Sequence, residues 1–429
     1  MKPNILLLMT DQQRWDAMEC SGDWVQTPNL ARIASEGVQF TNCVTTSPVC
    51  IPTRLSLATG LYPHNTGVWN NMHHQMSAKT PTWMQAVRDA GYRTSLFGKT
   101  HLHPHSGDLR EREELMNAYG LDDVGEIGGP RASANVLSHM TAEWEAKGLW
   151  DAYRADYRER FRNKPHVVRP SVLPLEDYAD VYVGQQAKRY LKRYDREEPW
   201  CCWVSFGGPH EPWDTPEPYA SLYNPADMPS AIPRPEAGER PRGHLDRLME
   251  RVNPNFEEGE IGRLRANYAG NVTLIDAQIG EILDVIQARG ELENTVIVHC
   301  SDHGEMNGDY GLIYKSNFLN GAVRIPLLVR TPDAVKGAIC DSPVEWIDIG
   351  PTLVELAGGE LEHRQFGKSL CPVLAQPAST HRDFAISEIE GEIMLLNRQW
   401  KIALNANGEA YLLFDVQNDA EETQNFAGR

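Results

Sequence analysis

The stretch SPVCIPTRLSLATG, residues 47–60, places a cysteine just before a helix-like run. Pro52 is well suited to the first turn of a helix, so we expect Cys50 at or just before the helix N-terminus. The helix dipole and the free N–H groups there favour an anion and would lower the pKa of a thiol. Cys50 is therefore a candidate for a thiolate nucleophile, a metal ligand, a buried thiol or the precursor of another group.

Four other polar clusters each follow a strand-like apolar run: Asp11-Gln12, Lys99-Thr100-His101, His210 and Asp302-His303. In an open α/β sheet the carboxyl ends of the strands form one edge, and ligands bind there. We therefore expect these residues to meet at that edge, although they lie far apart in the sequence.

Two carboxylates, an amide oxygen and an imidazole within these clusters are metal-ligand types: Asp11, Asp302, Gln12 and His303. The oxygen-rich set favours calcium, magnesium or manganese, while the imidazole keeps manganese and zinc open. For Asp11 the alternative is a turn or cap residue that ends a strand.

Positive charge and hydrogen-bond donors come from a second group: Arg54, Lys99, His101, His210 and Lys315. Each has an ordinary alternative, such as a packed loop histidine or a solvated lysine. Together with a metal ion they predict a local cationic pocket for an oxyanion, inside a chain that is otherwise acidic.

Apolar strands alternate with helical patterns along most of the chain. Strands are predicted at 4–9, 92–98, 199–206 and 294–301, and helices at 27–37, 81–91, 177–194 and 261–289. This order predicts an α/β fold with a large, mainly parallel sheet covered by helices on both faces. Thr27 is the predicted N-cap of its helix and Gly37 the stop signal.

From about residue 380 the pattern changes to short alternating runs separated by turn signals, which predicts a small antiparallel sheet. We interpret 1–375 as the catalytic domain and 376–429 as a small C-terminal subdomain. The charged segments 104–172 and 214–260 are interpreted as insertions over one rim, where selectivity would reside. In or near them, aromatic residues could line a pocket or pack: Trp144, Trp150, Tyr153, Trp213 and Tyr219.

The composition narrows the partners and the compartment. With 59 acidic and 41 basic residues the formal charge is −18, which argues against a general nucleic-acid or anionic-membrane binder. The eight cysteines contain no CxxC pair, as is typical of reduced intracellular thiols. The first residues lack the features of a secretory signal, and no stretch approaches about 20 apolar residues. We therefore expect a cytoplasmic protein that does not span a membrane.

The sequence resembles the type I, formylglycine-dependent sulfatases of the alkaline phosphatase superfamily. Their marker, Cys-x-Pro-x-Arg, is matched by Cys50, Pro52 and Arg54. The likeness continues in order through TPNLARIASEGVQFTN, AGYRTSLFGKTH, GGPHEPW, VIVHCSDHGEMNGDYGLIYKS and EWIDIGPTLVELAG, and so covers nearly the whole chain.

The resemblance implies an alkaline phosphatase-like fold and a sulfuric ester hydrolase. Cys50 would be oxidised by a formylglycine-generating maturation enzyme, and the hydrated aldehyde would be the nucleophile. The implied metal, usually calcium, would be held by Asp11, Gln12, residue 50, Asp302 and His303. The resemblance assigns sulfate binding to Arg54, Lys99 and Lys315, collapse of the hemiacetal to His101, and protonation of the leaving group to His210.

Some residues depart from the common sulfatase pattern. Gln12 stands where many sulfatases have a second Asp, and Tyr310 where His is common. The motif GKTH, with Thr100, resembles the corresponding motif of the phosphonate monoester hydrolase branch. Asn71 in GVWNN resembles an asparagine that contacts the transferred group in that branch and in choline sulfatases, and both residues are candidate substrate-binding positions.

The sequence therefore predicts hydrolysis of a sulfate monoester of a small molecule or a saccharide. A phosphonate monoester hydrolase or phosphodiesterase with the same nucleophile is the alternative. A non-catalytic binding homologue and a cysteine-thiolate hydrolase remain as hypotheses from other classes. Cytoplasmic relatives are often dimers or tetramers, so a homo-oligomer is also considered.

Overall fold

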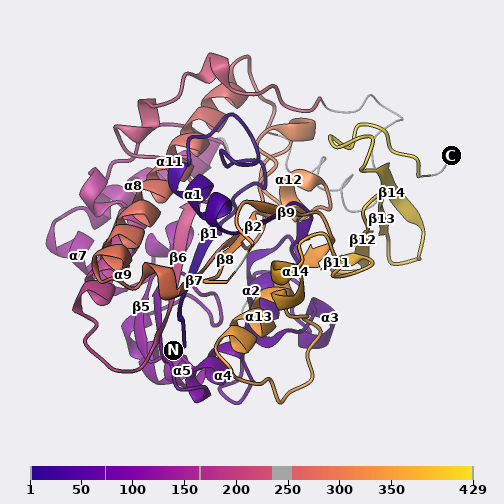
Figure 1. The fold of residues 1–429 in the computed structure, drawn as a ribbon. Helices are drawn as coiled ribbons and strands as arrows, with labels where there is room; N and C mark the ends of the chain where they lie inside the picture. The colour runs from indigo at the N-terminus through magenta and orange to yellow at the C-terminus, as the bar shows by residue number, and fades with distance from the viewer. Residues whose placement is uncertain (1, 73, 164–165, 234–253, 334, 428–429) are drawn as a thin grey trace.

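An eight-stranded sheet forms the centre of the computed structural model, which describes residues 2–72, 74–163, 166–233, 254–333 and 335–427 (Figure 1). From one edge to the other its strands are β5 (Asp123–Glu126), β4 (Arg93–Gly98), β6 (Trp200–Pro209), β1 (Asn4–Asp11), β7 (Thr295–Ser301), β8 (Leu327–Arg330), β2 (Val38–Phe40) and β9 (Ala338–Cys340). β8 runs antiparallel to both of its neighbours, and the other ladders are parallel. The predicted large, mainly parallel sheet is confirmed.

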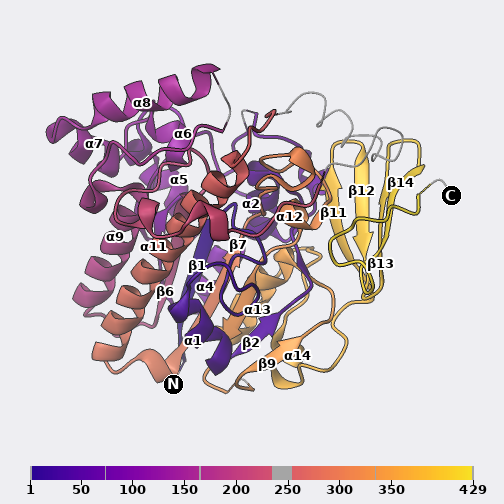
Figure 2. The same cartoon turned by 90° about the horizontal axis from the view of Figure 1, so that it is seen from above.

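Helices cover both faces of this sheet (Figures 1 and 2). Strand β1 is buried on both sides: its odd-numbered apolar residues, such as Leu7, face one hydrophobic cluster, and the even-numbered ones, such as Leu8, face another. The first cluster includes residues of α2 (Cys50–Thr59), α4 (Trp83–Asp89) and α13 (Ile349–Leu356), and the second those of α1 (Pro28–Glu36), α9 (Ala179–Arg193) and α11 (Glu260–Ala288). Alternate side chains of a doubly covered strand both find apolar partners, which explains its continuous apolar run.

The first helix begins where the sequence predicts, but its cap is different. Thr27 occupies the N-cap position, yet its hydroxyl accepts a hydrogen bond from the Glu19 N–H at 2.8 Å and makes no cap. The carboxylate of Asp276, on α11, accepts instead from the N–H groups of Asn29 and Leu30, at 3.1 and 2.8 Å. The cap therefore comes from a neighbouring helix, which no local pattern could reveal.

The segment 104–172 is more than an insertion. Its strand β5 pairs with β4 and forms one edge of the central sheet. The segment also forms α5 (Glu113–Ala118), α6 (Gly129–Ser133), α7 (His139–Ala146) and α8 (Trp150–Asn163). β5 is short and mostly polar, so it lacks the apolar run by which the other strands are recognised. Much of the second predicted insertion, 214–260, lies outside the described residues.

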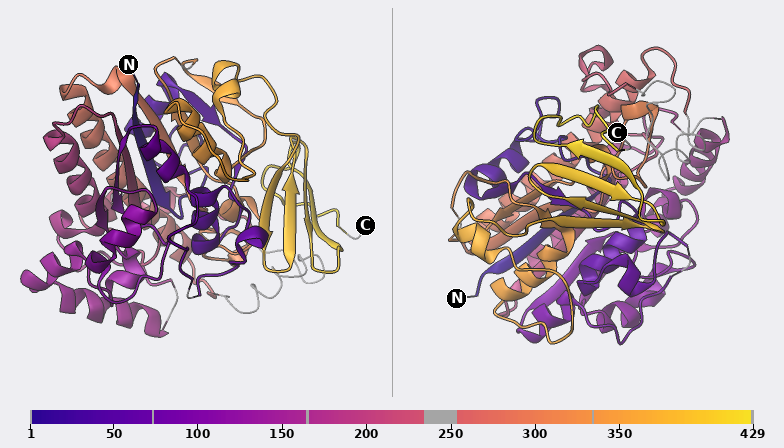
Figure 3. Two further views of the ribbon diagram at one scale, coloured as in Figure 1. Left: turned by 90° about the horizontal axis from the view of Figure 1, so that it is seen from below. Right: turned by 90° about the vertical axis from the view of Figure 1, so that its right-hand side faces the viewer.

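The predicted C-terminal antiparallel sheet is also confirmed (Figure 3). It consists of β11 (Ala385–Ile389), β12 (Glu392–Leu396), β13 (Trp400–Leu404) and β14 (Ala410–Asp415). Its inner side chains, Met394 and Ala403 among them, pack on Phe318 and Val323 of the main domain. The other short α-helices and strands of the described residues are α3 (Pro63–Thr66), α12 (Asn320–Val323), α14 (Cys371–Ala375), β3 (Cys43–Val44) and β10 (Val344–Glu345). Among the residues that the structure describes, no helix combines the length and the apolar character that crossing a membrane requires.

Candidate active site

Four neighbouring parallel strands of the central sheet end at the same edge, and each is followed by residues of the predicted site. In the order β4, β6, β1 and β7 these are Lys99, His210, Asp11-Gln12 and Asp302-His303, with Asp11 the last residue of β1. Gly98 lets the end of β4 approach β6 closely, because a Cβ there would lie 1.8 Å from the Ser205 carbonyl oxygen. The sheet therefore gathers residues from four distant segments, as predicted.

Helix α2 brings Cys50 to this edge. The helix begins at Cys50, so the predicted position of the cysteine at a helix N-terminus is confirmed. Val49 at the N-cap gives no side-chain cap, and the Asn71 Oδ1 accepts from the Ile51 N–H at 2.9 Å. Asn71 thus satisfies one terminal N–H group from outside the helix and lies beside residue 50 in the pocket.

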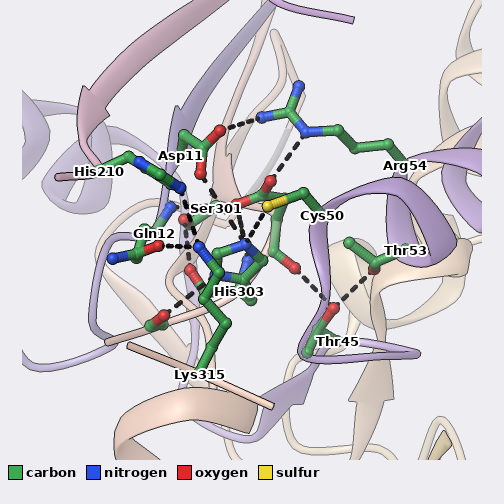
Figure 4. A network of polar contacts seen from close by, with 12 residues as sticks. Asp11, Gln12, Thr45, Cys50, Thr53, Arg54, His210, Ser301, His303 and Lys315 are labelled. Carbon is green, nitrogen blue, oxygen red and sulfur yellow. Dashed lines mark hydrogen bonds and ion pairs between the residues drawn. The ribbon is translucent and has the colours of Figure 1, made fainter. Parts of the chain in front are cut away.

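Cys50 faces a buried group of two carboxylates and an imidazole (Figure 4). Ligand atoms of Asp11, Cys50, Asp302 and His303 all lie within 4.8 Å of one another. The His303 Nε2 is 3.0 Å from the Cys50 Sγ, 3.6 Å from the Asp302 Oδ1 and 3.8 Å from the Asp11 Oδ1. All four residues are buried.

This cluster fits a divalent cation. The Asp11 Oδ1 is buried without a hydrogen-bond partner among the described residues, and an unpartnered buried carboxylate oxygen is costly. The His303 Nδ1 lies 3.0 Å from the Gly304 carbonyl, which can only accept, so Nδ1 carries the proton and Nε2 can present a lone pair. Asp11, Asp302, His303 and residue 50 could therefore hold such an ion.

Arg54 lies one helical turn after Cys50 and binds both carboxylates rather than lining the pocket. Its Nε donates to the Asp302 Oδ2 at 2.8 Å and its Nη2 to the Asp11 Oδ2 at 3.2 Å. Its Nη1 donates to the Lys99 carbonyl at 2.8 Å. The guanidinium is fully buried, so its main structural effect is to fix the geometry of the two carboxylates.

Lys99 approaches Asp11 from the pocket side. Its ammonium pairs with the Asp11 Oδ2 and the residue lines the pocket. Burial alone would raise the pKa of the Asp11 carboxyl, but Lys99, His210 and Arg54 together hold that pKa well below its usual range. Asp11 is therefore an anion at neutral pH.

The side chain of Gln12 is oriented by two acids that the sequence analysis did not single out. Its Nε2 donates to the Glu211 Oε2 at 3.1 Å and also to Glu305. Because both carboxylates only accept, the amide must turn its oxygen the other way, where Lys315 donates to it. This arrangement explains a glutamine at the position where many sulfatases have an aspartate.

Gln12→Asp should therefore be damaging. It would set a third carboxylate against Glu211 and Glu305, and we expect kcat/KM to fall about 10- to 100-fold, since each tenfold corresponds to about 1.4 kcal/mol. Adding Glu305→Gln should recover part of the loss because it removes one of the opposing charges. Steady-state kinetics of the single and double variants test this, with Gln376→Asp, at an exposed position, as the control. Strictly additive losses would contradict the explanation.

Lys315 and His210 form a pair at the pocket wall. The His210 Nδ1 lies 2.8 Å from the Glu211 carbonyl and so carries a proton, which leaves Nε2 to accept from the Lys315 ammonium at 2.9 Å. Burial lowers the pKa of Lys315, but Cys50, Glu211 and Asp11 outweigh it and raise that pKa. A lysine that stays protonated beside His210 supplies both positive charge and a proton source.

His101 and Thr100 follow Lys99 but face different surroundings. His101 lines the pocket and has a backbone φ of 59°. Its backbone N–H donates to the His105 Nε2, and its ring Nδ1 has no hydrogen-bond partner among the described residues. Burial, with Lys99 and His105, lowers the pKa of His101, so its ring is neutral.

Thr100 is fully buried and donates its hydroxyl to Glu126, so the structure places this predicted substrate-binding residue behind the pocket wall.

The pKa of the Cys50 thiol is shifted in the opposite direction to those of the other seven cysteine thiols. Burial would raise its pKa, but Lys315, His303 and Lys99 outweigh burial and lower it well below that of a free thiol. The other seven cysteine thiols have raised pKa values, chiefly because of burial. The helix terminus and the surrounding cations thus favour an anion at position 50.

This difference can be tested by alkylation of metal-free protein made without the maturation enzyme. Because the Cys50 pKa is lowered, its thiolate persists at neutral pH, and its rate with iodoacetamide should stay nearly constant between pH 9 and 7. Cys20, whose thiol pKa is raised to about 11, should react more slowly and lose rate with each unit of falling pH. Peptide mass spectrometry gives both rates, and a Cys50 rate that falls in parallel with that of Cys20 would contradict the assignment.

One pocket of about 970 Å³ opens above these residues. Its floor includes Cys50, Lys99, His101, His210 and Lys315, and its wall includes the aromatic residues Trp69 and Tyr314 together with Arg131 from α6. The insertion aromatics considered above pack instead: Trp144, Trp150, Tyr153 and Trp213 are buried in the hydrophobic clusters, and Tyr219 packs against one of them. Trp69 and Tyr314 escaped the sequence analysis because each stands singly in a loop.

Comparisons with known proteins agree with this geometry. The chain is 29% identical to a choline-sulfatase of Rhizobium meliloti over 99% of its own length and 82% of that protein. It is 28% identical to an arylsulfatase of Clostridium perfringens, over 99% and 90% of the two chains. Its fold matches the phosphonate monoester hydrolase of Agrobacterium radiobacter with a TM-score of 0.77 at 24% identity, over 99% of this chain and 91% of that one. The Sulfatase family model matches residues 3–359, so this chain belongs to the sulfatase family.

Proposed function

We propose that this protein hydrolyses the sulfate monoester of a small organic molecule or a saccharide, with residue 50 as formylglycine hydrate. The observation that carries the proposal is the position of Cys50: at a helix N-terminus, 3.0 Å from His303, between a buried carboxylate pair and two pocket lysines. Family membership supports the same reaction. The pocket of about 970 Å³ is large enough for a saccharide unit beyond the sulfate group.

A divalent cation, with calcium preferred over magnesium or manganese, would be held by Asp11, Asp302, His303 and residue 50. The predicted ligand Gln12 would join them only by turning its oxygen away from Lys315. The two carboxylates are hard ligands, which suits calcium. Such an ion would lower the pKa of a hydroxyl on residue 50 and offset negative charge on the sulfate oxygens.

The remaining groups have complementary tasks. Lys99 and Lys315 line the pocket together with residue 50 and would neutralise the oxygens of the transferred group, whose charge the acidic surface would otherwise repel. Arg54 would hold Asp11 and Asp302 in place beneath them. Asn71 would present its amide N–H₂ group to the transferred group, because its oxygen is held by the Ile51 N–H.

Proton transfer falls to the two histidines. The Lys315 ammonium would pass a proton to the His210 Nε2, and His210 would then protonate the departing alkoxide or phenoxide oxygen. His101 is neutral and faces Cys50, so it can accept the proton from the second hydroxyl of the hydrate as sulfate leaves and the aldehyde is restored. A serine or cysteine lacks that second hydroxyl and would remain as a covalent ester.

The alternative is a phosphonate monoester hydrolase or phosphodiesterase that uses the same nucleophile. Thr100 in GKTH resembles that branch, whereas Asn71 resembles both that branch and choline sulfatases. Rates with 4-nitrophenyl sulfate, bis(4-nitrophenyl) phosphate and a phenylphosphonate monoester, measured on fully matured enzyme with added calcium or manganese, separate the two. A kcat/KM for the phosphorus esters that greatly exceeds that for the sulfate would overturn the first choice.

The non-catalytic alternative and the thiolate alternative are tested on the same preparation. The intact mass of the peptide that carries Cys50 shows whether the thiol has become an aldehyde. An unmodified thiol after coexpression with the maturation enzyme, together with no turnover, would support a binding homologue. Turnover that iodoacetamide abolishes and chelators do not affect would support a cysteine-thiolate hydrolase.

A further inference from the structure

A second cluster of metal-ligand types lies behind the pocket wall, apart from the cluster around Cys50. His103 and His105 follow His101 in the loop after β4, and Glu126 ends the neighbouring strand β5. The His103 Nε2 is 2.8 Å from the Glu126 Oε2, and the His105 Nε2 is 3.1 Å from the Glu126 Oε1. At most 3% of each side chain is exposed.

Backbone carbonyls fix the protons on both rings. The His103 Nδ1 is 3.0 Å from the Pro104 oxygen, and the His105 Nδ1 is 3.2 Å from the Gly128 oxygen. A carbonyl oxygen only accepts, so each Nδ1 carries a proton. Each Nε2 of a neutral ring then has a lone pair, and that lone pair faces a carboxylate oxygen.

For His105 the direction of this lone pair has independent support. The His101 backbone N–H donates to the His105 Nε2 at 3.3 Å, so this nitrogen acts as an acceptor. The same nitrogen lies 3.1 Å from an acceptor oxygen of Glu126. Two acceptors at that distance repel each other unless a proton or a metal cation lies between them.

The cluster around Cys50 shows the same arrangement, since His303 also has its Nδ1 on a backbone carbonyl and its Nε2 toward carboxylates. An Nδ1–H donated to a carbonyl is the usual support of a metal-bound histidine. One ligand atom from each of His103, His105 and Glu126 lies within 4.8 Å of the others.

We propose that His103, His105 and Glu126 form a second metal site, for a divalent ion of intermediate softness such as Zn²⁺. Two imidazoles and one carboxylate suit zinc, whereas the carboxylate-rich cluster at Cys50 suits a harder ion. His105 also lines the pocket, so the ion would lie next to the substrate space. The ion would stiffen the loop that carries His101 and add positive charge to the pocket.

This site does not depend on the proposed sulfatase reaction, and its test measures metal rather than turnover. The background is the triple variant Cys50→Ala/Arg54→Met/Asp302→Asn, which lacks two donors of the other cluster and leaves no buried charge without its main partner. Chelator-treated protein is titrated with Zn²⁺ in equilibrium dialysis and with Co²⁺ in visible absorption, because nitrogen-bound Co²⁺ shows d–d bands that report its ligands.

We expect one Zn²⁺ per chain in this background and Co²⁺ bands of nitrogen ligation. Adding His105→Gln or Glu126→Gln should weaken binding at least about 100-fold and remove the bands. The matched control is His64→Gln, because His64 pairs with Glu388 at 2.7 Å and is half exposed. Binding that is absent in the background, or that both site variants leave unchanged, would overturn the proposal.

Folding is followed separately, by circular dichroism and thermal unfolding of every variant. If a site variant unfolds, the background protein still decides the question. A Zn²⁺-dependent rise in its Tm, together with Zn²⁺-dependent shifts of the His103 and His105 Nε2 nitrogen signals in NMR spectra, supports the site. Two histidines that keep both ring protons in the presence of Zn²⁺ would show a protonated cluster and no metal site.

Discussion

Cys50→Ala is expected to lower kcat/KM for a sulfate ester by about 10⁴-fold or more, because it removes the nucleophile while the binding groups remain. The substitution leaves the pocket lysines and the buried carboxylates unchanged. The substrate should therefore still bind, and KM should change far less than kcat. Initial rates with 4-nitrophenyl sulfate on matured enzyme measure the effect.

Two companion variants sharpen this result. Cys50→Ser keeps a hydroxyl but cannot form the hydrate, so we expect at most one leaving group released per chain and then no turnover. Cys371→Ala, a partly buried cysteine of α14 outside the pocket, should retain wild-type rates. In wild-type preparations the rate should rise in proportion to the fraction of formylglycine found by peptide mass spectrometry. Substantial turnover by Cys50→Ala would contradict the assigned nucleophile.

Asp302→Asn is expected to have the second largest effect, on both stability and activity. Asp302 accepts from the Arg54 Nε at 2.8 Å, and both side chains are fully buried. Removing one charge of such a pair leaves the other poorly compensated, which costs about 3–5 kcal/mol in the free energy of unfolding. The loss of a hard ligand should also lower kcat/KM about 10³-fold and weaken calcium binding.

Urea unfolding, calcium titration and kinetics measure the three effects. Asp341→Asn is the matched control, because Asp341 pairs with Arg398 on the surface at 3.0 Å and such pairs contribute about 0–1 kcal/mol. A second comparison adds Arg54→Met to Asp302→Asn. The double variant should be less destabilised than the sum of the two single variants, since no buried charge is then left without its main partner. Wild-type stability of Asp302→Asn would mean that the pair has no structural role.

The structure also separates two roles that the resemblance assigns to one group of cations. Lys99 and Lys315 line the pocket, whereas Arg54 is directed away from it onto Asp11 and Asp302. The side chain that completes the sequence marker thus holds the two carboxylates, and the lysines supply the charge that an oxyanion would meet. A resemblance transfers positions, but the direction of a long side chain depends on the partners that surround it.

The sequence by itself determined the fold class, the strands that end at the site and the helix that begins at Cys50. Those features depend on local periods and on Pro52, which act within a few residues of one another. It also supplied the residue types that meet at the sheet edge, because parallel strands always bring their carboxyl ends together.

Only the tertiary structure decided which side chains face one another. The Asp276 cap of α1, the Glu211 and Glu305 contacts of Gln12, and the meeting of His103 and His105 with Glu126 each join segments that are not adjacent in the chain. β5 escaped recognition because its short polar sequence becomes a strand only beside β4. Such contacts depend on the packing of whole elements, and no spacing within one segment encodes them.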